Sequence, residues 1–295
     1  MKDLPTVAVL LAVYEPSDAL IAQLKSINQQ VGVKVVLYIG DDGSSSDVKE
    51  KYKDYLPESF HYFSFDRIGP GQNFMNLLSN TQNEDYFAFS DQDDIWLEGK
   101  LLKHVSILSL ENQVVAGTHS NSAVLRGDKV SLKKSRCNEH LLSQLLTENC
   151  VQGCTLVINQ KARDLICSEK NQSVIWHDWW IGLILASVGR LIHVPGTDTL
   201  YRIHQENAIG LPNFKERVKR SFERHPGTLL NQHKLLLDSY SPHMRENDSK
   251  VLQNWIRRWD RGFLGRTISA ATDQKRRKFL VDDVLRRITG ISKKP

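Results

Sequence analysis

The chain has 295 residues, of which 40% are hydrophobic and 25% charged, as is typical of soluble globular proteins. No apolar run approaches the roughly 18–20 residues that a membrane-spanning helix needs, and the first residues do not resemble a signal peptide. Both observations predict a cytoplasmic protein. The four cysteines lack the spacing of a zinc site and are expected to be free thiols: Cys137, Cys150, Cys154 and Cys167.

The net charge of +5 is distributed unevenly along the chain. From Pro212 to the end there are 20 Lys and Arg against 9 Asp and Glu, whereas acidic residues outnumber basic ones before that point. Such an asymmetry indicates two regions with different tasks. We therefore expect a first domain over residues 1–211 and a basic region over 212–295.

The first 90 residues alternate apolar, β-rich segments with segments of helical periodicity. Residues 6–13 are apolar throughout and predict a central strand, and Pro16 suits the first turn of a helix that continues to about Gln30. The next predicted elements are strands at 33–39, 60–65 and 86–90 and helices at 47–55 and 71–81. Strands that alternate with helices predict an α/β fold with a mostly parallel sheet. The first, second and fourth strands are expected to lie side by side.

The second half of the chain is less regular but continues the same pattern. Its predicted elements are a helix from Trp96 to about Leu110, strands at 118–125 and 155–159, a buried helix at 175–188, and short strands at 191–194 and 199–203. From residue 212 onward the pattern is helical, basic and amphipathic. The expected architecture is a sheet flanked by helices, followed by a basic helical C-terminal region.

The most informative segment is the acidic stretch that follows the strand at 86–90. Three carboxylates, Asp91, Asp93 and Asp94, come directly after an apolar run. In open α/β sheets ligands bind just past the carboxyl ends of the strands, and close carboxylates repel one another unless a cation lies between them. Oxygen ligands favour Mg²⁺ or Mn²⁺, which in turn suit a substrate diphosphate. The alternative is a solvated acidic turn that caps the following helix.

Polar clusters also follow the first three strands, at residues 14–15, 41–44 and 66–73. Their carboxylates can accept hydrogen bonds from base N–H groups and ribose hydroxyls, and Arg67 can pair with a phosphate. Gly69 and Gly71 allow a ligand to approach the backbone closely. Each cluster alone is consistent with a turn or a helix cap, but their joint occurrence favours a nucleotide diphosphate site.

With these motifs the sequence resembles the family 2 glycosyltransferases of the GT-A fold, a Rossmann-like α/β fold, over roughly residues 5–210. The motifs that carry the resemblance are Val13-Tyr14, DDGSSSD at 41–47, the Gly/Asn stretch at 69–73 and DQDD at 91–94. A narrower resemblance is to the bacterial rhamnosyltransferase branch. It rests on SDQDDIW at 90–96, HDWW at 177–180 and YRIHQEN at 201–207.

The resemblance implies roles for residues at the nucleotide. Asp42 would contact the pyrimidine base, while Tyr14 and Glu15 would line the nucleotide pocket. Arg67 and Asn73 would help to hold the nucleotide. Many relatives have Asn where this chain has Glu15 followed by Pro, so this sequence departs from the family pattern there.

The resemblance also implies roles at the reacting end of the donor. Asp91 would hold the ribose or a metal-bound water, and Asp93 would ligate Mn²⁺ or Mg²⁺, a task that Asp94 could share. His204 matches a histidine that in some relatives reaches the metal or the diphosphate. Asp178 matches the catalytic base of the family.

The residues around Asp178 support the same role independently. It lies between His177 and two tryptophans, at the start of a stretch that is otherwise apolar. Burial among aromatic side chains raises the pKa of a carboxylate and makes it a better base. The alternative is an N-cap that starts the helix.

The resemblance implies an inverting, metal-dependent transfer of a sugar to a hydroxyl group. The rhamnosyltransferase branch implies dTDP-β-L-rhamnose as donor and a growing cell-surface polysaccharide, often lipid-linked, as acceptor. Transferases of other UDP- or dTDP-sugars remain alternatives. So do a metal-dependent phosphatase or nucleotidyltransferase that uses the same carboxylates and a nucleic-acid-binding protein, which the basic tail suggests. No RNA- or DNA-binding motif supports the last of these, and no nucleic-acid partner is expected.

The basic tail suggests a peripheral membrane location on the cytoplasmic side. Basic residues flank apolar ones at 214–224 and again at 275–288. Such a pattern suits a helix that lies on anionic lipid. The alternative is a helical region whose apolar stripes face the protein core and whose charges face water.

Overall fold

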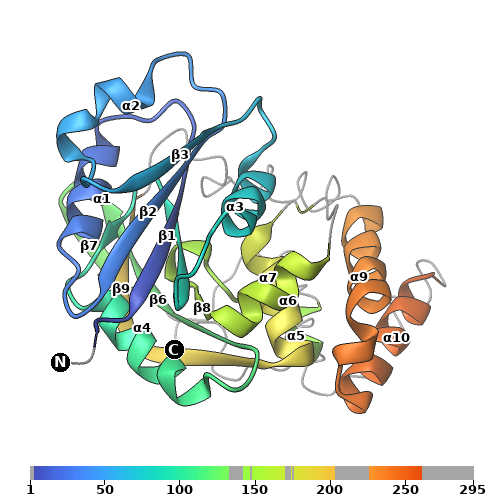
Figure 1. The fold of residues 1–295 in the computed structure, drawn as a ribbon. Helices are drawn as coiled ribbons and strands as arrows, with labels where there is room; N and C mark the ends of the chain where they lie inside the picture. Colours follow the sequence, from blue (N-terminus) through green and yellow to red (C-terminus); the bar gives the residue numbers. More distant parts are fainter. Residues whose placement is uncertain are drawn as a thin grey trace.

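The computed structural model describes residues 3–132, 142–146, 148–169, 174, 176–202 and 226–260. Within them, helices cover both faces of a curled β-sheet (Figure 1). The strands are β1 (Thr6–Val13), β2 (Lys34–Asp41), β3 (Phe60–Ser64), β4 (Tyr86–Asp91), β5 (Ile95–Trp96), β6 (Ala116–Arg126), β7 (Lys129–Leu132), β8 (Val157–Asn159) and β9 (Arg190–Arg202).

The helices connect the strands or follow the sheet. They are α1 (Ala19–Asn28), α2 (Val48–Lys51), α3 (Pro70–Ser79), α4 (Lys100–Leu108), α5 (Leu142–Leu145), α6 (Gln160–Ser168), α7 (His177–Val188), α9 (Pro226–Tyr240) and α10 (Glu246–Asp260). Short 3₁₀ turns are η1 (Lys53–Tyr55), η2 (Ser109–Glu111), η3 (Gly153–Thr155) and η4 (Ser241–His243).

The strand order is β3-β2-β1-β4-β8-β6-β9-β5, and β7 pairs with β6. Strands β3, β2, β1 and β4 are parallel, and β1 lies between β2 and β4. The α/β fold and its parallel core are therefore confirmed. Beyond β4 the sheet is mixed, because β8 runs antiparallel to both β4 and β6 while β9 runs parallel to β6.

Strand β9 replaces the two short strands predicted at 191–194 and 199–203. The strand continues through Pro195 and Gly196, which lie between the two predicted strands. Gly196 adopts a φ of +92°, and the register with β6 shifts opposite this point, between His119 and Ser122. A bulge therefore takes the place of the predicted break, because glycine accepts a backbone conformation that other residues avoid.

Alternation along β1 explains how the sheet supports two cores. Its residues Val7, Val9 and Leu11 pack with α1 and α4 on one face. Its residues Ala8 and Leu10 pack with α3 and α7 on the other. Because both faces are covered, a strand of this kind is apolar at every position, as the sequence at 6–13 predicted.

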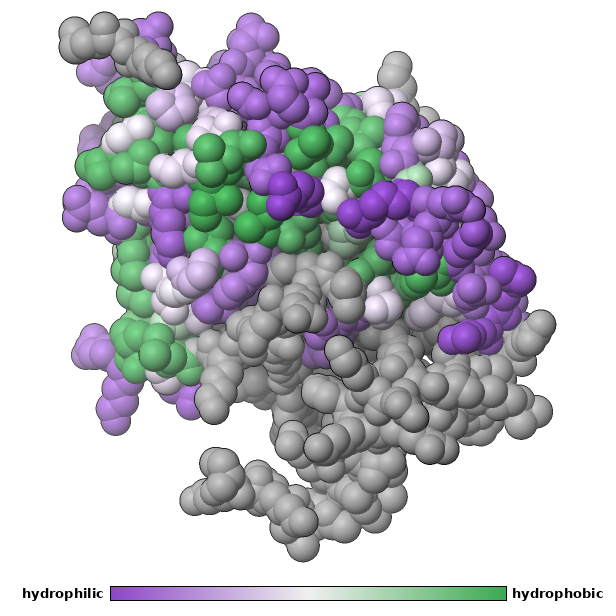
Figure 2. All heavy atoms as spheres, turned by 90° about the horizontal axis from the view of Figure 1, so that it is seen from below, coloured by the Kyte–Doolittle hydropathy of each residue, from purple (hydrophilic) through white to green (hydrophobic). Residues whose placement is uncertain are grey.

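Helix α7 is buried along almost its whole length. Its residues are buried from Trp179 to Ser187 on every side, as expected for a helix that lies within the core. None of the helices that the structure describes is long and apolar enough to cross a membrane. On the face seen in Figure 2, hydrophobic residues are interspersed with hydrophilic ones, and such scattered surface apolar residues are ordinary in globular proteins.

Helix α9 packs against α7, and α10 packs against α9 and α5 (Figure 1). The ring of Tyr240 meets that of Trp180 edge-on at 6.0 Å, and Leu236 and Trp255 join the same apolar cluster. These parts of the tail are helical, as predicted. The basic segments at 214–224 and 275–288 lie outside the described residues, and the division of the chain at residue 211 stays a prediction.

The cysteines follow the sequence prediction only in part. Cys154 and Cys167 are free thiols. Cys150 is disulfide-bonded, which the prediction of free thiols did not include. The spacing of cysteines along a sequence does not show which of them meet in space.

Replacing Gly40 by Ala should destabilise the protein, because α3 lies directly on β2 at this point. A Cβ atom on Gly40 would overlap Oδ1 of Asn73 and lie 3.1 Å from Cδ1 of Leu77. Overpacking of this kind costs about 1–3 kcal/mol. Urea unfolding should show a loss of that size in the free energy of unfolding.

The variant Asn73→Ala serves as the control, since it removes the amide that the new methyl group would meet. The double variant should then lose less stability than the two single losses combined. Full additivity, or no loss in Gly40→Ala, would contradict the close packing of α3 on β2.

Candidate active site

The carboxyl ends of three neighbouring strands are level with one another. Val13 of β1 lies beside Asp41 of β2, and Ala12 of β1 lies beside Asp91 of β4. The polar residues that follow these strands therefore meet at one edge of the sheet, as the sequence predicted. This is the edge at which open α/β sheets bind their ligands.

Tyr14, Glu15 and Arg67 form one side of this edge. The Arg67 guanidinium lies 4.1 Å from the centroid of the Tyr14 ring and donates a hydrogen bond to the Tyr14 hydroxyl. Arg67 and Glu15 are the non-glycine residues with positive φ in the described part of the chain, at 53° and 42°. Such backbone costs about 1–3 kcal/mol per residue and is concentrated at functional sites. The strain therefore falls on residues that the sequence assigned to the nucleotide.

Two carboxylates at this edge hold the loops of the pocket. The Glu15 carboxylate accepts hydrogen bonds from the backbone N–H of Ser45 at 2.8 Å and from its hydroxyl at 3.0 Å. The Asp42 carboxylate accepts hydrogen bonds from the backbone N–H groups of Ile68 and Gly69, at 2.7 and 2.9 Å. In this conformation Asp42 therefore fixes the loop that carries Arg67.

Asn73 lies below the pocket rather than on its surface. Its side chain is 1% exposed, and its Nδ2 donates a hydrogen bond to the carbonyl of Gly40 at 2.7 Å. Asn73 therefore connects α3 to β2. The sequence placed it at the nucleotide because it belongs to the Gly/Asn stretch, whose glycines lie at the helix start.

Asp91, Asp94 and Cys154 form a group whose potential metal-ligand atoms all lie within 4.8 Å of one another. Asp94 is fully buried, and its Oδ1 accepts a hydrogen bond from the backbone N–H of Arg202 at 3.2 Å, while its Oδ2 has no hydrogen-bond partner. Burial, then the neighbouring carboxylates, raise the pKa of Asp91 well above its usual value. Burial and the charge of Asp93 raise the pKa of Asp94 to about 7.

This group fits a divalent cation. An ion would offset the repulsion that raises both pKa values, and it would give the buried Oδ2 of Asp94 a partner. Burial raises the pKa of the Cys154 thiol well above its usual value, so the two carboxylates are the charged donors of the set, and carboxylate oxygens suit Mn²⁺ and Mg²⁺ alike.

The grouping differs from the ligand set expected from the sequence. Asp91 is grouped with Asp94, not with Asp93 as the main ligand. The backbone carbonyl of Asp93 accepts a hydrogen bond from Nε of Arg202 at 3.1 Å, so the end of β9 holds the acidic turn. His204 lies outside the described residues.

Asp178 lies in the first turn of α7, but it is not the N-cap, which is Trp176. Burial raises the pKa of Asp178 to about 6, although hydrogen bonds from the Trp179 backbone, the Asn149 side chain and the Gly153 backbone act in the opposite direction. Asp178 is close enough to the acidic turn that its charge contributes to the raised pKa of Asp91. The candidate base and the candidate metal group therefore belong to one site.

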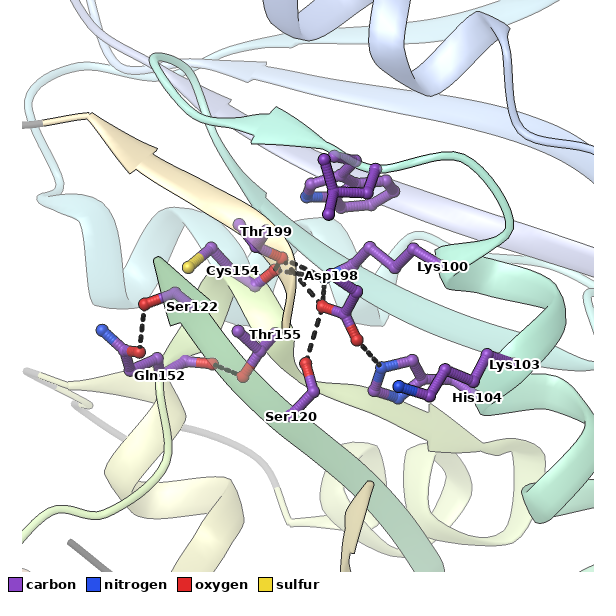
Figure 3. Close-up of polar contacts among 12 residues, drawn as sticks. Lys100, Lys103, His104, Ser120, Ser122, Gln152, Cys154, Thr155, Asp198 and Thr199 are labelled. Atoms are coloured by element: carbon purple, nitrogen blue, oxygen red, sulfur yellow. Dashed lines mark hydrogen bonds and ion pairs between the residues drawn. The ribbon is translucent and has the colours of Figure 1, made fainter. Parts of the chain in front are cut away.

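The sequence interpretation missed several residues at this site. Cys154 was counted among free thiols without a role, and Lys100 and Asp198 were not singled out. These three contribute to a buried polar network beneath the acidic turn (Figure 3). A single polar residue within an apolar stretch can indicate a buried polar network. The sequence does not show which residues pair, however, because the members of this network lie far from one another along the chain.

Known proteins support the assignment of the fold and show the family. Residues 8–161, just over half of the chain, match the family described as Glycosyl transferase family 2, and the chain belongs to that family. A structure of S. aureus TarS 1–349 in complex with UDP-GlcNAc is similar, with a TM-score of 0.57 and 13% identity over 85% of this chain and 70% of that chain. The GT-A-type fold is therefore confirmed.

Two curated proteins are similar over most of their lengths. The dTDP-rhamnosyl transferase RfbG of Shigella flexneri is 28% identical over 228 residues, which cover 71% of this chain and 77% of that protein. The UDP-Glc:alpha-D-GlcNAc-diphosphoundecaprenol beta-1,3-glucosyltransferase WfgD of Escherichia coli is 21% identical over 219 residues, which cover 74% and 84%. Both relatives are glycosyltransferases, and their names give different donor sugars.

If the acidic group holds a cation, Mn²⁺ should stabilise the protein through Asp94. Binding at about 100 times the dissociation constant adds about 2.7 kcal/mol, and for a chain of this size that raises Tm by about 5–10 °C. The rise should appear in wild type at pH 8, where Asp94, with a pKa of about 7, is largely ionised, and should be lost in Asp94→Asn. Thermal unfolding with and without Mn²⁺ measures it.

Asp85→Asn is the matched control, because Asp85 lies next to the opposite end of β4 and bonds to the backbone and hydroxyl of Thr6. This variant should keep the full response to Mn²⁺. An equal rise in wild type and Asp94→Asn would exclude Asp94 as a ligand.

Proposed function

We propose that this protein transfers a sugar from a nucleotide diphosphate to a hydroxyl acceptor with inversion at the anomeric carbon, and that Asp178 is the general base. The observation that carries the proposal is the position of Asp178. It is a partly buried carboxylate near the acidic group, with a pKa of about 6. A base with this pKa is largely ionised at neutral pH and still takes a proton effectively.

In the proposed step, the acceptor oxygen attacks C1 of the sugar and loses its proton to the carboxylate of Asp178. The bond between C1 and the diphosphate oxygen breaks on the opposite side. The products are a glycoside, a nucleoside diphosphate and protonated Asp178, which then releases its proton to water. A single in-line displacement inverts the anomeric centre.

The donor would lie along the level strand ends. Tyr14 and Arg67 would contact the nucleotide, with their loop held by Asp42. Asp91, Asp94 and Cys154 would hold Mn²⁺ or Mg²⁺, and we retain Asp93 and His204 as further candidate ligands. When bound, the ion neutralises negative charge on the departing diphosphate. The buried carboxylates keep that ion at the end of β4.

We propose dTDP-β-L-rhamnose as the donor, which would give an α-L-rhamnoside. The motifs at 90–96, 177–180 and 201–207 and the similarity to the Shigella flexneri rhamnosyl transferase support this choice. The proposed acceptor is a growing cell-surface polysaccharide or a lipid-linked oligosaccharide. The name of the Escherichia coli relative, which acts on a diphosphoundecaprenol-linked sugar, supports a lipid-linked acceptor.

We further propose that residues 1–211 carry the catalytic site and that the basic region, residues 212–295, places the enzyme on the cytoplasmic face of the membrane. A lipid-linked acceptor would make that position useful, and anionic lipid would attract the basic residues. Sedimentation with anionic and neutral liposomes at low and high salt tests this. Equal binding to both kinds of vesicle at low salt would contradict it.

The central experiment is a donor screen with UDP- and dTDP-sugars in the presence of Mn²⁺ or Mg²⁺. Release of a nucleoside diphosphate together with a glycoside is the expected result, with dTDP-β-L-rhamnose as the best donor. Release of inorganic phosphate or pyrophosphate would instead indicate a phosphatase or a nucleotidyltransferase.

Asp178→Asn should bind donor nearly normally but transfer slowly. Loss of a general base costs on the order of 10²–10⁴ in rate. In wild type, kcat should fall as the pH decreases through about 6, since protonated Asp178 cannot accept a proton. Initial rates between pH 5 and 8, with nucleotide binding measured by calorimetry, test both points.

Asp164→Asn provides the control, because Asp164 is an exposed carboxylate that pairs with Arg163 on α6. It should leave rate and pH profile unchanged. A turnover of Asp178→Asn within about twofold of wild type would rule out the base.

A further inference from the structure

Lys100, the first residue of α4, is a fully buried cation with three hydrogen-bond acceptors. Its Nζ donates to the backbone carbonyl of Cys154 at 2.8 Å, the hydroxyl of Thr199 at 2.6 Å and Oδ1 of Asp198 at 3.2 Å (Figure 3). An ammonium group has three N–H donors, so each of them has a partner. Its position is therefore set from three directions.

Asp198 is the anion that balances Lys100. Its Oδ1 also accepts a hydrogen bond from the hydroxyl of Ser120 at 2.6 Å, and its Oδ2 lies 3.0 Å from Nε2 of His104. Burial alone would raise the pKa of Asp198, but Lys100 and the hydrogen bond with His104 hold it well below its usual value. Burial lowers the pKa of His104, so the imidazole is neutral near pH 7. The network therefore contains one positive and one negative charge.

The carbonyl that Lys100 holds belongs to η3, and η3 touches both parts of the candidate site. The thiol of Cys154 belongs to the metal-binding group, and the backbone of Gly153 hydrogen-bonds to Asp178. The turn also lies directly under the start of α7, because a Cβ atom on Gly153 would come within 2.6 Å of Nε2 of His177. A shift of η3 would therefore move the metal-binding group and the base relative to each other.

We propose that Lys100 is a positioning residue for the transfer reaction, and that it acts by holding η3 between the acidic group and Asp178. This rests on the proposed function. The ammonium fixes the carbonyl of Cys154, Asp198 fixes the ammonium, and the strands β6 and β9 fix Asp198 through Ser120 and Thr199. The distance between the two ends of the reaction, the departing diphosphate and the acceptor hydroxyl, depends on this connection.

A purely stabilising role is the alternative, but it does not explain the arrangement. A buried ion pair gives little net stability relative to apolar residues of the same size, because both charges lose their hydration. The network is better explained by its effect on η3, because the Lys100 ammonium fixes the position of the Cys154 carbonyl.

The test is the double variant Lys100→Met/Asp198→Asn, which removes both members of the buried ion pair. Rates are compared at pH 8 and saturating Mn²⁺, because the charge of Lys100 also lowers the pKa of Asp94. We expect it to bind dTDP within about threefold of wild type and to lose about 10²-fold in kcat, the cost of a misplacement of about 1 Å. Hydrogen exchange should also be faster in peptides that contain the backbone amides of Thr155 and Leu156, which bond to Gln152 and Gly153 within η3. Peptides from β1 and β2 should keep their protection.

Thr199→Val is the second variant, in case the double variant does not fold. It removes one acceptor of the Lys100 ammonium and keeps the shape of the side chain, so we expect a smaller loss in kcat, of about fivefold to tenfold, at unchanged nucleotide affinity. Arg163→Met is the matched control. Arg163 also donates to a backbone carbonyl, that of Thr81 at 2.6 Å, but Thr81 follows the C-terminal end of α3, whereas the loop that carries Arg67 precedes its N-terminal end. It should lower Tm without lowering kcat.

The outcomes separate the inference from the proposed function. A folded Lys100 variant with kcat within about threefold of wild type, or with losses in nucleotide affinity and kcat of equal size, would overturn the positioning role. If wild type itself transfers no sugar in the donor screen, the proposed function fails, and hydrogen exchange still decides whether Lys100 holds η3. If hydrogen exchange at η3 is unchanged in both the double variant and Thr199→Val, the inference that Lys100 holds η3 is wrong as well.

Discussion

The repulsion among carboxylates at the end of β4 is the constraint on which this site depends. Parallel strands in register end level, so the polar residues after β1, β2 and β4 are forced together. Asp94 is fully buried there, and its charge has to be balanced. Hydrogen bonds with the Cys154 side chain and the Arg202 backbone and the charge of Lys100 lower the pKa of Asp94, but burial and the charge of Asp93 outweigh them. A cation bound at this point would offset the repulsion among the carboxylates, and it would in turn bind a diphosphate.

The parallel half of the fold could be predicted because its signals are local. Residues 6–13 are apolar at every position since β1 is covered on both faces, and alternation with helices predicted that β1, β2 and β4 lie side by side. The position of Tyr14 at the edge of the sheet could be predicted as well, because a polar residue directly after an apolar strand lies at its carboxyl end. The uniform apolar character of α7 likewise indicated a helix inside the core.

The rest depends on contacts that sequence patterns do not contain. Lys100 and Asp198 are 98 positions apart, and nothing near either residue indicates the other. Cys154 joins Asp91 and Asp94 only because β8 enters the sheet beside β4. Nor does a motif show which carboxylates are already bound by their own backbone, as Asp42 is by Ile68 and Gly69. The sequence predicted two short strands at 191–194 and 199–203, and only the pairing with β6 shows that they form one continuous strand.

The chain order of the site also bears on how the protein folds. Strands β1 to β4 are joined by successive short crossovers, whereas Arg202 reaches Asp94 across 108 positions of sequence. Contacts between distant residues form late, because the chain must close a long loop before the contact contributes any energy. During synthesis the N-terminal half emerges first and can assemble its loops at Tyr14 and Arg67 before β9 exists. The acidic turn is thus completed at a later stage than the loops that carry Tyr14 and Arg67.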